Sequence, residues 1–342
     1  MMLPPETVAE HLDRLAKPRG SLGKLERLAI DLARIQGTLR PETRPRSLLI
    51  FAGDHGVVAD GVGIWPSDVT ASMIGLIASG RACCSALAAA SATEVALVDV
   101  GSLIEAAPLT EIYRDRRIAR GTASLARGPA MSPAEFWSAW QAGEAEVARA
   151  AADGIRVLAL GEIGIGNTTA AACLIALGTG GDTDALVGPG AGATDASLAR
   201  KRNVVAEAVS RARQTIKTDP VAAMAAVAGY EIVAMAGAIA AASQHEIPIV
   251  IDGVVSGAAA IVAQAVDPSA LECVIASHNG AEPAHGKALE HLGLEPYLEW
   301  DLRLGEGTGA LLLMPMLDAA AALLTGVAKL EEVTGPASGA TS

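Results

Sequence analysis

The chain has 342 residues, of which 51% are hydrophobic and only 3% aromatic, and it carries a formal net charge of −12. This length suits one large α/β domain, alone or with a small one, and the excess of Ala, Val, Leu and Ile suits parallel strands covered by close-packed helices. The negative charge excludes a general affinity for nucleic acid, whose phosphates it would repel, and no basic cluster offsets it.

Short apolar runs that end in polar, glycine-containing turns recur along the chain. They lie at 47–57, 94–101, 155–167, 247–254 and 271–280. Alanine-rich helical patterns separate them, at 68–91, 133–152, 168–178, 195–216, 220–243 and 254–265. Strand, turn and helix repeated in this order predict a parallel sheet with helices on its faces. Because ligands bind beyond the carboxyl ends of parallel strands, we expect the polar turns to form one site.

Three segments depart from this alternation. Residues 6–36 predict helices interrupted by the segment KPRGSLG, and residues 102–132 predict an irregular insertion. The tail after about residue 326 ends in Gly, Ser and Pro, and we expect it to fray.

The sequence predicts neither export nor a membrane span. The N-terminal segment is charged throughout and lacks the apolar core of a signal peptide. Stretches 220–243 and 308–326 are apolar, but Glu231 interrupts the first, and Pro315 and Asp318 interrupt the second. Both therefore predict buried helices. The four cysteines form neither a disulfide framework nor a metal motif, so we expect a cytoplasmic protein without a membrane partner.

The segment GEIGIGNTTAAA (161–172) follows a predicted strand and opens a predicted helix. Its glycines let the backbone approach an anion, and the Asn and Thr residues are expected to cap the helix and donate hydrogen bonds, as in phosphate sites at helix N-termini. No Gly-Lys-Ser/Thr follows, so it is not a Walker motif, and a turn that binds nothing is the alternative. A second glycine-rich turn, 188–201, brings in a lysine. The predicted phosphate and ribose ligands are Gly161, Gly164, Gly166, Asn167, Thr168 and Lys201.

Two carboxylates stand in glycine turns, Glu162 in GEIG and Glu306 in RLGEGTGA (303–310). A solvated surface glutamate needs no flanking glycines, whereas an acid that a ligand must approach closely does. A desolvated carboxylate also has a raised pKa and is a better base. We therefore expect both to be catalytic. The alternative for each is a buried structural acid.

The other strand ends carry further polar candidates. Glu282 and His285 follow His278 at spacings that could supply metal ligands on a helix. The Glu282–Pro283 pair, however, is also typical of a helix start where a carboxylate stabilises the dipole. We expect no metal and no cofactor. The remaining site candidates at these turns are Asp54, His55, Asp252, Ser277 and His278.

Taken together, the motifs closely resemble the nicotinate-nucleotide:dimethylbenzimidazole phosphoribosyltransferase (CobT) family. The resemblance extends from about residue 8 to 325, and its most diagnostic part is the segment that ends in RLGEGTGA. The motifs occur in the order KPRGSLGKLERLA, AGDHGV, WPSDVT, GEIGIGNTTAAA, GATDASLARK, VIDGVVSGAA and SHNGAEPAHGKALEHLGLEPYLEWDLRLGEGTGA.

The resemblance implies a Rossmann-like domain over 46–310 and a small helical domain built from 1–45 and 311–342, in a homodimer. It implies transfer of phosphoribose from nicotinate mononucleotide to 5,6-dimethylbenzimidazole or a related base, giving α-ribazole 5′-phosphate and nicotinate for the cobalamin lower ligand. The family's catalytic base falls on Glu306, its second active-site glutamate on Glu162, and its phosphate-contacting lysine on Lys201.

The segment expected to bind the benzimidazole departs from the family. Trp65 and Pro66 open the WPSDVT motif, but Ser72 stands where the family usually has a glutamine that contacts the base. In addition, GRACCSALA (80–88) replaces a more regular Gly/Ala-rich segment, and Asn279 precedes Gly280 where the family usually has a serine before the Ala-Glu pair. The sequence therefore leaves open which benzimidazole-type base the chain accepts.

Two other functions are compatible with parts of the pattern. A dinucleotide-binding oxidoreductase has a similar fold, but its glycine turn follows the first strand, whereas this one follows a middle strand. A non-catalytic nucleotide-binding subunit would have lost Glu306 or the glycine turn at 161–166, and this chain keeps both.

Overall fold

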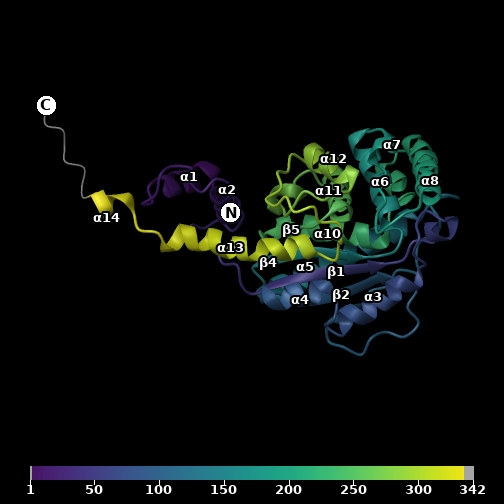
Figure 1. The fold of residues 1–342 in the computed structure, drawn as a ribbon, viewed down its shortest axis with the longest axis horizontal. Coiled ribbons are helices and arrows are strands. Elements are labelled where there is room, and N and C mark those ends of the chain that lie inside the picture. The colour runs from purple at the N-terminus through teal and green to yellow at the C-terminus, as the bar shows by residue number, and fades with distance from the viewer. Residues whose placement is uncertain (1, 335–342) are drawn as a thin grey trace.

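Six parallel strands form the centre of the computed structural model, which describes residues 2–334 (Figure 1). Across the sheet they are ordered β3-β2-β1-β4-β5-β6. This is the strand order of a doubly wound dinucleotide-binding sheet. Strands are added toward one edge from β1 to β3 and toward the other edge from β4 to β6. Their bounds are Arg46–Gly53 (β1), Glu94–Gly101 (β2), Tyr113–Asp115 (β3), Val157–Ile163 (β4), Ile249–Ile251 (β5) and Val274–Ala276 (β6).

Helices cover both faces of the sheet, as the sequence predicts. Those before β4 are α1 (Pro5–Asp13), α2 (Lys24–Ile35), the 3-10 helix η1 (Gly56–Asp60), α3 (Asp68–Ala78), α4 (Cys83–Ala90) and α5 (Pro133–Ala152). Those between β4 and β5 are α6 (Asn167–Thr179), α7 (Thr183–Leu186), α8 (Asp195–Arg213), α9 (Pro220–Ala225) and α10 (Tyr230–Gln244). The last are α11 (Val254–Val266), the 3-10 helix η2 (Ala270–Cys273), α12 (Pro283–Leu292), α13 (Thr308–Gly326) and α14 (Leu330–Thr334).

The alternating side chains of β1 serve two separate cores. Leu49 and Phe51 belong to the core shared with α5, α6, α10 and α11. Leu48 and Ile50 belong to the core shared with α2, α3, α4 and α13. Every residue of β1 is buried, which is what a central parallel strand requires.

The structure corrects the predicted elements at three places. The insertion at 102–132 contains a short edge strand, β3, paired with β2. The predicted helix 68–91 is two helices, α3 and α4, because the chain turns at Gly80, whose φ of 73° a helix does not allow. The predicted helix 220–243 is likewise divided into α9 and α10.

The chain ends lie together, away from the sheet. Figure 1 shows α1, α2, the far end of α13 and α14 projecting beyond the main body. The segment before α14 pairs with the end of α1, since Leu15 bridges Lys329 and the Leu330 N–H donates to the Arg14 carbonyl. The tail predicted to fray is therefore ordered as far as residue 334, and 335–342 lie outside the described residues. The predicted domain limits remain a prediction. Helix α13 runs across the limit at 310 without a break.

Two described segments are long and apolar enough to cross a membrane by length and composition alone, Asp68–Ala90 and Thr308–Gly326. The first contains the turn between α3 and α4. The second is α13, which packs on α2, α4 and β4. The other apolar stretch noted in the sequence, 220–243, forms α9 and α10, and the residues of α10 from Tyr230 to Ala242 are all buried, as predicted.

Candidate active site

A cavity opens at the carboxyl ends of β4, β5 and β6. The turns after these three strands line it, together with the 189–192 loop and the 302–308 segment. The expectation that the polar turns form one site is therefore correct for these strands. The sequence-predicted residues that line the cavity are Gly161, Glu162, Gly164, Gly166, Asn167, Thr168, Lys201, Trp65, Asp252, His278 and Glu306.

The turn between β4 and α6 forms one wall of this cavity. A Cβ on Gly164 would lie 2.2 Å from the carbonyl oxygen of Gly53, so only glycine lets the turn pack on the end of β1. Gly166 precedes α6 with a φ of 95°, and no side chain caps the helix. The helix N-terminus is thus left open to the cavity, as an anion site requires. The prediction that Asn167 and Thr168 cap α6 is wrong, because both side chains have other partners.

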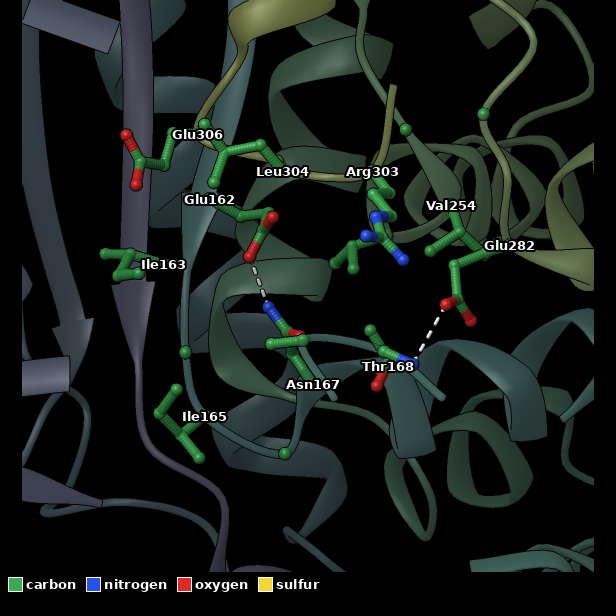
Figure 2. Close-up of a pocket in the computed structure, with 18 of the residues that line it drawn as sticks. Glu162, Ile163, Ile165, Asn167, Thr168, Val254, Glu282, Arg303, Leu304 and Glu306 are labelled. Atoms are coloured by element: carbon green, nitrogen blue, oxygen red, sulfur yellow. Dashed lines mark hydrogen bonds between the residues drawn. The ribbon is translucent and has the colours of Figure 1, made fainter. Parts of the chain in front are cut away.

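Those partners join the turn to its surroundings. Asn167 Nδ2 donates to Glu162 Oε2 (Figure 2), and Lys201 Nζ donates to Thr168 Oγ1 at 2.8 Å and to the Gly188 carbonyl at 3.0 Å. Lys201 is only 2% exposed, so the expectation of a mobile surface lysine is wrong. Burial lowers the pKa of Lys201 to about 8. A bound phosphate would favour its charged form again.

The second glycine turn carries Glu306. Gly305, Glu306 and Gly307 all have positive φ, at 88°, 59° and 76°. This conformation is costly for a glutamate, and strain of this kind persists only where the surroundings enforce it. Asp252, from the end of β5, enforces it here. Its carboxylate accepts the N–H groups of Gly307 at 3.1 Å, Gly309 at 2.7 Å and Ala310 at 3.3 Å, which fixes the start of α13.

The Glu306 carboxylate itself lies at the start of α4. Its Oε2 accepts the backbone N–H of Cys84 at 3.4 Å, and Glu306 is buried. A helix N-terminus favours a negative charge, so this contact stabilises the ionised carboxylate. Figure 2 shows the side chain turned away from that of Glu162. Cys84 belongs to the segment in which the sequence departs from the family, and nothing in the sequence pattern indicated this contact.

The two glycine turns pack directly on one another. A Cβ on Gly161 would lie 2.7 Å from the Glu306 carbonyl carbon, and a Cβ on Gly305 would lie 2.4 Å from Glu162 Oε1. Burial raises the pKa of Glu162 to about 8, with the Asp252 and Glu231 carboxylates acting in the same direction and the hydrogen bond from Asn167 opposing it. This upward shift favours the protonated form of Glu162.

Asp54 and His55 lie behind this wall and do not line the cavity. His55 Nε2 pairs with Glu231 Oε1 at 2.7 Å, and both side chains are fully buried. Burial lowers the pKa of His55, but the Glu231 carboxylate outweighs it and the net shift is upward. Asp54 accepts the Leu103 N–H at 2.8 Å. The sequence marked Glu231 only as an interruption of an apolar stretch, and in the structure it pairs with His55 beneath the β4–α6 turn.

Two histidines with lowered pKa values lie near Asp252, and of these only His278 lines the cavity. His278 Nδ1 lies 3.8 Å from Asp252 Oδ1 and 2.9 Å from the Ser277 hydroxyl, and burial lowers its pKa. His285 Nδ1 accepts the Gly280 N–H at 2.8 Å, and burial lowers its pKa to about 3. Ser277 is buried and lies outside the cavity lining. No group of three or more metal-ligating side chains gathers among residues 2–334, and the expectation of metal-free catalysis stays a prediction.

Of the residues expected to bind the benzimidazole, one lines the cavity. Trp65 is half exposed at the rim, and its Nε1 donates to the Ala191 carbonyl at 3.2 Å. Pro66 and Ser72 are exposed and lie outside the lining. The Ser72 hydroxyl donates to the Asp68 carbonyl within α3 at 3.1 Å. The roles of Pro66 and Ser72 therefore stay predictions.

Two charged residues outside the predicted site list, Glu282 and Arg303, also line the cavity. Glu282 Oε1 accepts the Gly190 N–H at 2.9 Å, which ties the loop near Lys201 to the start of α12. Arg303 opens the RLGEGTGA segment and projects into the cavity (Figure 2). The signal for Arg303 was present, since it lies three residues before Glu306 in the most diagnostic motif.

Comparison with known proteins agrees with this geometry. A family model described as phosphoribosyltransferase matches residues 5–334. The chain belongs to this phosphoribosyltransferase family. Among its relatives, it is 42% identical to nicotinate-nucleotide–dimethylbenzimidazole phosphoribosyltransferase from Azotobacter vinelandii, over 92% of this chain and 89% of the relative. The protein of the same name from Thermus thermophilus is 41% identical, over 94% and 96%.

Solved structures of the family confirm the fold. A crystal structure of CobT from Thermus thermophilus matches with a TM-score of 0.92 at 40% identity, covering 96% of this chain and 98% of that one. The predicted Rossmann-like α/β fold and the predicted enzyme class are thus both confirmed. In this chain the carboxylates of Glu162 and Glu306 and the glycine turn at 161–166 meet at the cavity.

Proposed function

We propose that the chain transfers phosphoribose from nicotinate mononucleotide to 5,6-dimethylbenzimidazole or a related base, giving nicotinate and α-ribazole 5′-phosphate for the cobalamin lower ligand. The observation that carries this proposal is the pairing of two features in one cavity. An anion cradle at the α6 N-terminus is formed with Thr168 and Lys201, and the buried Glu306 carboxylate lies on the adjoining turn. The names of the relatives supply the substrates.

The reaction asks for one base and no acid at the leaving group. Nicotinate leaves from a pyridinium, so the electron pair of the broken C1′–N bond neutralises the ring nitrogen. The attacking benzimidazole forms the new C1′–N bond with one nitrogen and must lose the proton on the other. We assign removal of that proton to Glu306, whose carboxylate the α4 N-terminus holds ionised.

Glu162 serves a different purpose in this proposal. A carboxyl that is protonated at neutral pH donates a hydrogen bond rather than accepting a proton. It lies between the Asn167 amide and the Glu306 turn, within the cavity lining. We infer that it positions the ribose next to the catalytic base, a task that needs the neutral acid.

The phosphate end supplies binding energy and alignment. The open N-terminus of α6, the Thr168 hydroxyl and the Lys201 ammonium together suit a 5′-phosphate. Holding the phosphate fixes the anomeric carbon relative to Glu306, and such positioning is a large part of catalysis in bimolecular transfers.

We further propose a homodimer in the cytoplasm. The support for a dimer is that large apolar side chains, Ile64, Trp65 and Leu76, are exposed on α3 and on the segment before it. Exposed apolar side chains on one segment favour a protein interface. The support for the cytoplasm is that all four cysteines are free. Light scattering at micromolar concentration is expected to give twice the chain mass, and the mass of one chain would contradict the dimer.

The reaction is tested by incubating the enzyme with nicotinate mononucleotide and dimethylbenzimidazole. Nicotinate is measured by chromatography and the ribazole phosphate by mass. We expect the two products to appear in equal amounts, and neither to appear when dimethylbenzimidazole is omitted. Nicotinate release that does not depend on the benzimidazole would indicate a hydrolase, and no release at all would contradict the proposal outright.

A further inference from the structure

The cavity contains more acidic than basic side chains, and its basic side chains differ in burial and in hydrogen bonding. Its lining includes four carboxylates, whereas the lysine and arginine side chains in it number two, Lys201 and Arg303. A nicotinate mononucleotide also carries two anionic groups, the 5′-phosphate and the ring carboxylate. The four carboxylates are those of Glu162, Asp252, Glu282 and Glu306.

Lys201 lies at the end of the cavity where the N-terminus of α6 is proposed to bind the phosphate. It is almost fully buried, and its ammonium already bridges Thr168 and the Gly188 carbonyl beside the N-terminus of α6. These groups together satisfy a phosphate without a further cation. The second cation is therefore available for the second anion.

Arg303 has the opposite character. It is exposed at the cavity mouth, and within residues 2–334 its side chain has neither a hydrogen-bond nor an ion-pair partner. The loop that carries it is fixed, because the Leu302 carbonyl accepts the Ala281 N–H at 3.1 Å and Glu306 follows on the constrained turn. In Figure 2 the guanidinium points into the cavity, on the side of Thr168 and Glu282. Its fork of N–H donors matches a carboxylate in shape and charge.

We propose that Arg303 binds the ring carboxylate of nicotinate and so makes the enzyme prefer nicotinate mononucleotide over nicotinamide mononucleotide. The inference rests on the proposed function, because that function supplies the donor. The position suits the departing group, since Arg303 lies at the open mouth through which a released ring leaves, whereas Lys201 lies inside. Without such a cation, the ionised carboxylates of the cavity would repel the nicotinate carboxylate and favour the amide.

The test compares both donors in wild type, Arg303→Gln and Arg303→Lys at saturating dimethylbenzimidazole. We expect Arg303→Gln to lower kcat/KM for nicotinate mononucleotide about ten- to a hundredfold, mainly through KM, as is usual when one charge-assisted pair is lost. For nicotinamide mononucleotide the change is expected to stay below about threefold, because that donor lacks the carboxylate. Arg303→Lys is expected to recover part of the preference, since it keeps the charge but not the fork.

Two control variants separate this effect from others. Lys201→Ala is expected to weaken both donors alike, because both carry the phosphate. Arg149→Gln, on the exposed face of α5, is expected to change neither. An equal loss for both donors in Arg303→Gln would place Arg303 at the shared phosphate and overturn the proposal. An unchanged preference would overturn it as well.

A binding measurement keeps the inference independent of turnover. Calorimetry with free nicotinate and free nicotinamide needs no reaction. We expect wild type to bind nicotinate about tenfold or more tightly than nicotinamide, and Arg303→Gln to bind the two about equally. If wild type is inactive in the transfer assay yet shows this difference, the proposed reaction fails and the Arg303 assignment stands. If wild type is active and binds the two rings equally, the reaction stands and the Arg303 assignment fails.

Discussion

The two glycine turns of the cavity, 161–167 and 305–309, look alike in sequence and differ in what they do to their carboxylates. In the first, Glu162 sits among other acids, and its pKa rises to about 8. In the second, Glu306 contacts the backbone N–H of Cys84 at the start of α4. One turn stabilises a neutral acid and the other an anion. Glycine in both turns serves close packing, since each turn lies within van der Waals distance of the other.

The difference teaches that an acid in a glycine turn is not by itself a base. Its protonation depends on its burial and on the charged groups and helix ends that the fold places next to it. For Glu162 the fold brings Asp252 and Glu231, and for Glu306 it brings a helix N-terminus. Two neighbouring carboxylates can thus divide the work of positioning and proton removal.

Removing Asp252 is expected to have the largest effect, because its carboxylate holds the Glu306 turn. Asp252→Ala leaves the N–H groups of Gly307, Gly309 and Ala310 without their acceptor. We expect a loss of about 2–4 kcal/mol in the free energy of unfolding and more than about a hundredfold loss in kcat. Chemical denaturation and steady-state kinetics measure the two. An Asp252→Ala variant with normal turnover would show that Glu306 needs no such support.

Replacing Glu162 sharpens the comparison through pH. The folded-state pKa of about 8 lies above the ordinary glutamate value of 4.5, so between these values the folded state keeps a proton that the unfolded state has lost. Wild-type stability therefore falls as pH rises through this window, and Glu162→Gln lacks that fall. Between pH 5 and 8 the variant is expected to gain on the order of 3 kcal/mol relative to wild type. A constant difference between pH 5 and 8, measured by urea unfolding, would mean that folding does not raise the pKa of Glu162.

Lys201→Ala tests the cradle end, where we expect an intermediate effect. A phosphate remote from the reacting carbon contributes mainly binding, so KM for the mononucleotide is expected to rise by about tenfold or more, with a smaller change in kcat. Burial of Lys201 adds a pH dependence, because its pKa of about 8 makes the free enzyme lose this charge as pH rises past that value. An unchanged KM would assign phosphate recognition to the 161–169 turn alone.

Cys84→Ala is expected to have the smallest effect. Alanine keeps the backbone N–H of Cys84 that donates to Glu306, and it loses only the weak hydrogen bond between the Cys84 thiol and that carboxylate. Turnover is therefore expected to stay within about threefold of wild type, since alanine also favours the helix. A much larger loss would show that the thiol itself supports the carboxylate. Cys83→Ala, at the exposed neighbouring position, is the matched control.

The sequence predicts the parts of this site that are local in the chain. The strand–turn–helix rhythm gives the parallel sheet, and glycines around Glu162 and Glu306 mark both turns. It does not predict contacts between distant segments. The pairing of His55 with Glu231 and the capping of α13 by Asp252 depend on how the β1, β5 and α10 ends meet.

Lys201 illustrates the same limit. A lysine on a charged helical segment predicts an exposed side chain, and only the fold of the 188–192 loop over α8 buries it. The small helical region is a further case. Pairing of residues near Leu15 with Lys329 orders a segment whose composition alone predicts fraying.

The central claim is that Glu306 is the ionised base and Glu162 the neutral partner, and parallel assays of Glu306→Gln and Glu162→Gln at pH 7 test it most directly. Glutamine resembles a protonated glutamate, so Glu162→Gln is expected to keep at least about a tenth of wild-type turnover. Glu306→Gln is expected to lower turnover by about a hundredfold to ten-thousandfold while still binding the mononucleotide. Glu290→Gln, on the surface of α12, serves as control. If Glu162→Gln loses more turnover than Glu306→Gln, the two roles are reversed and the account is wrong.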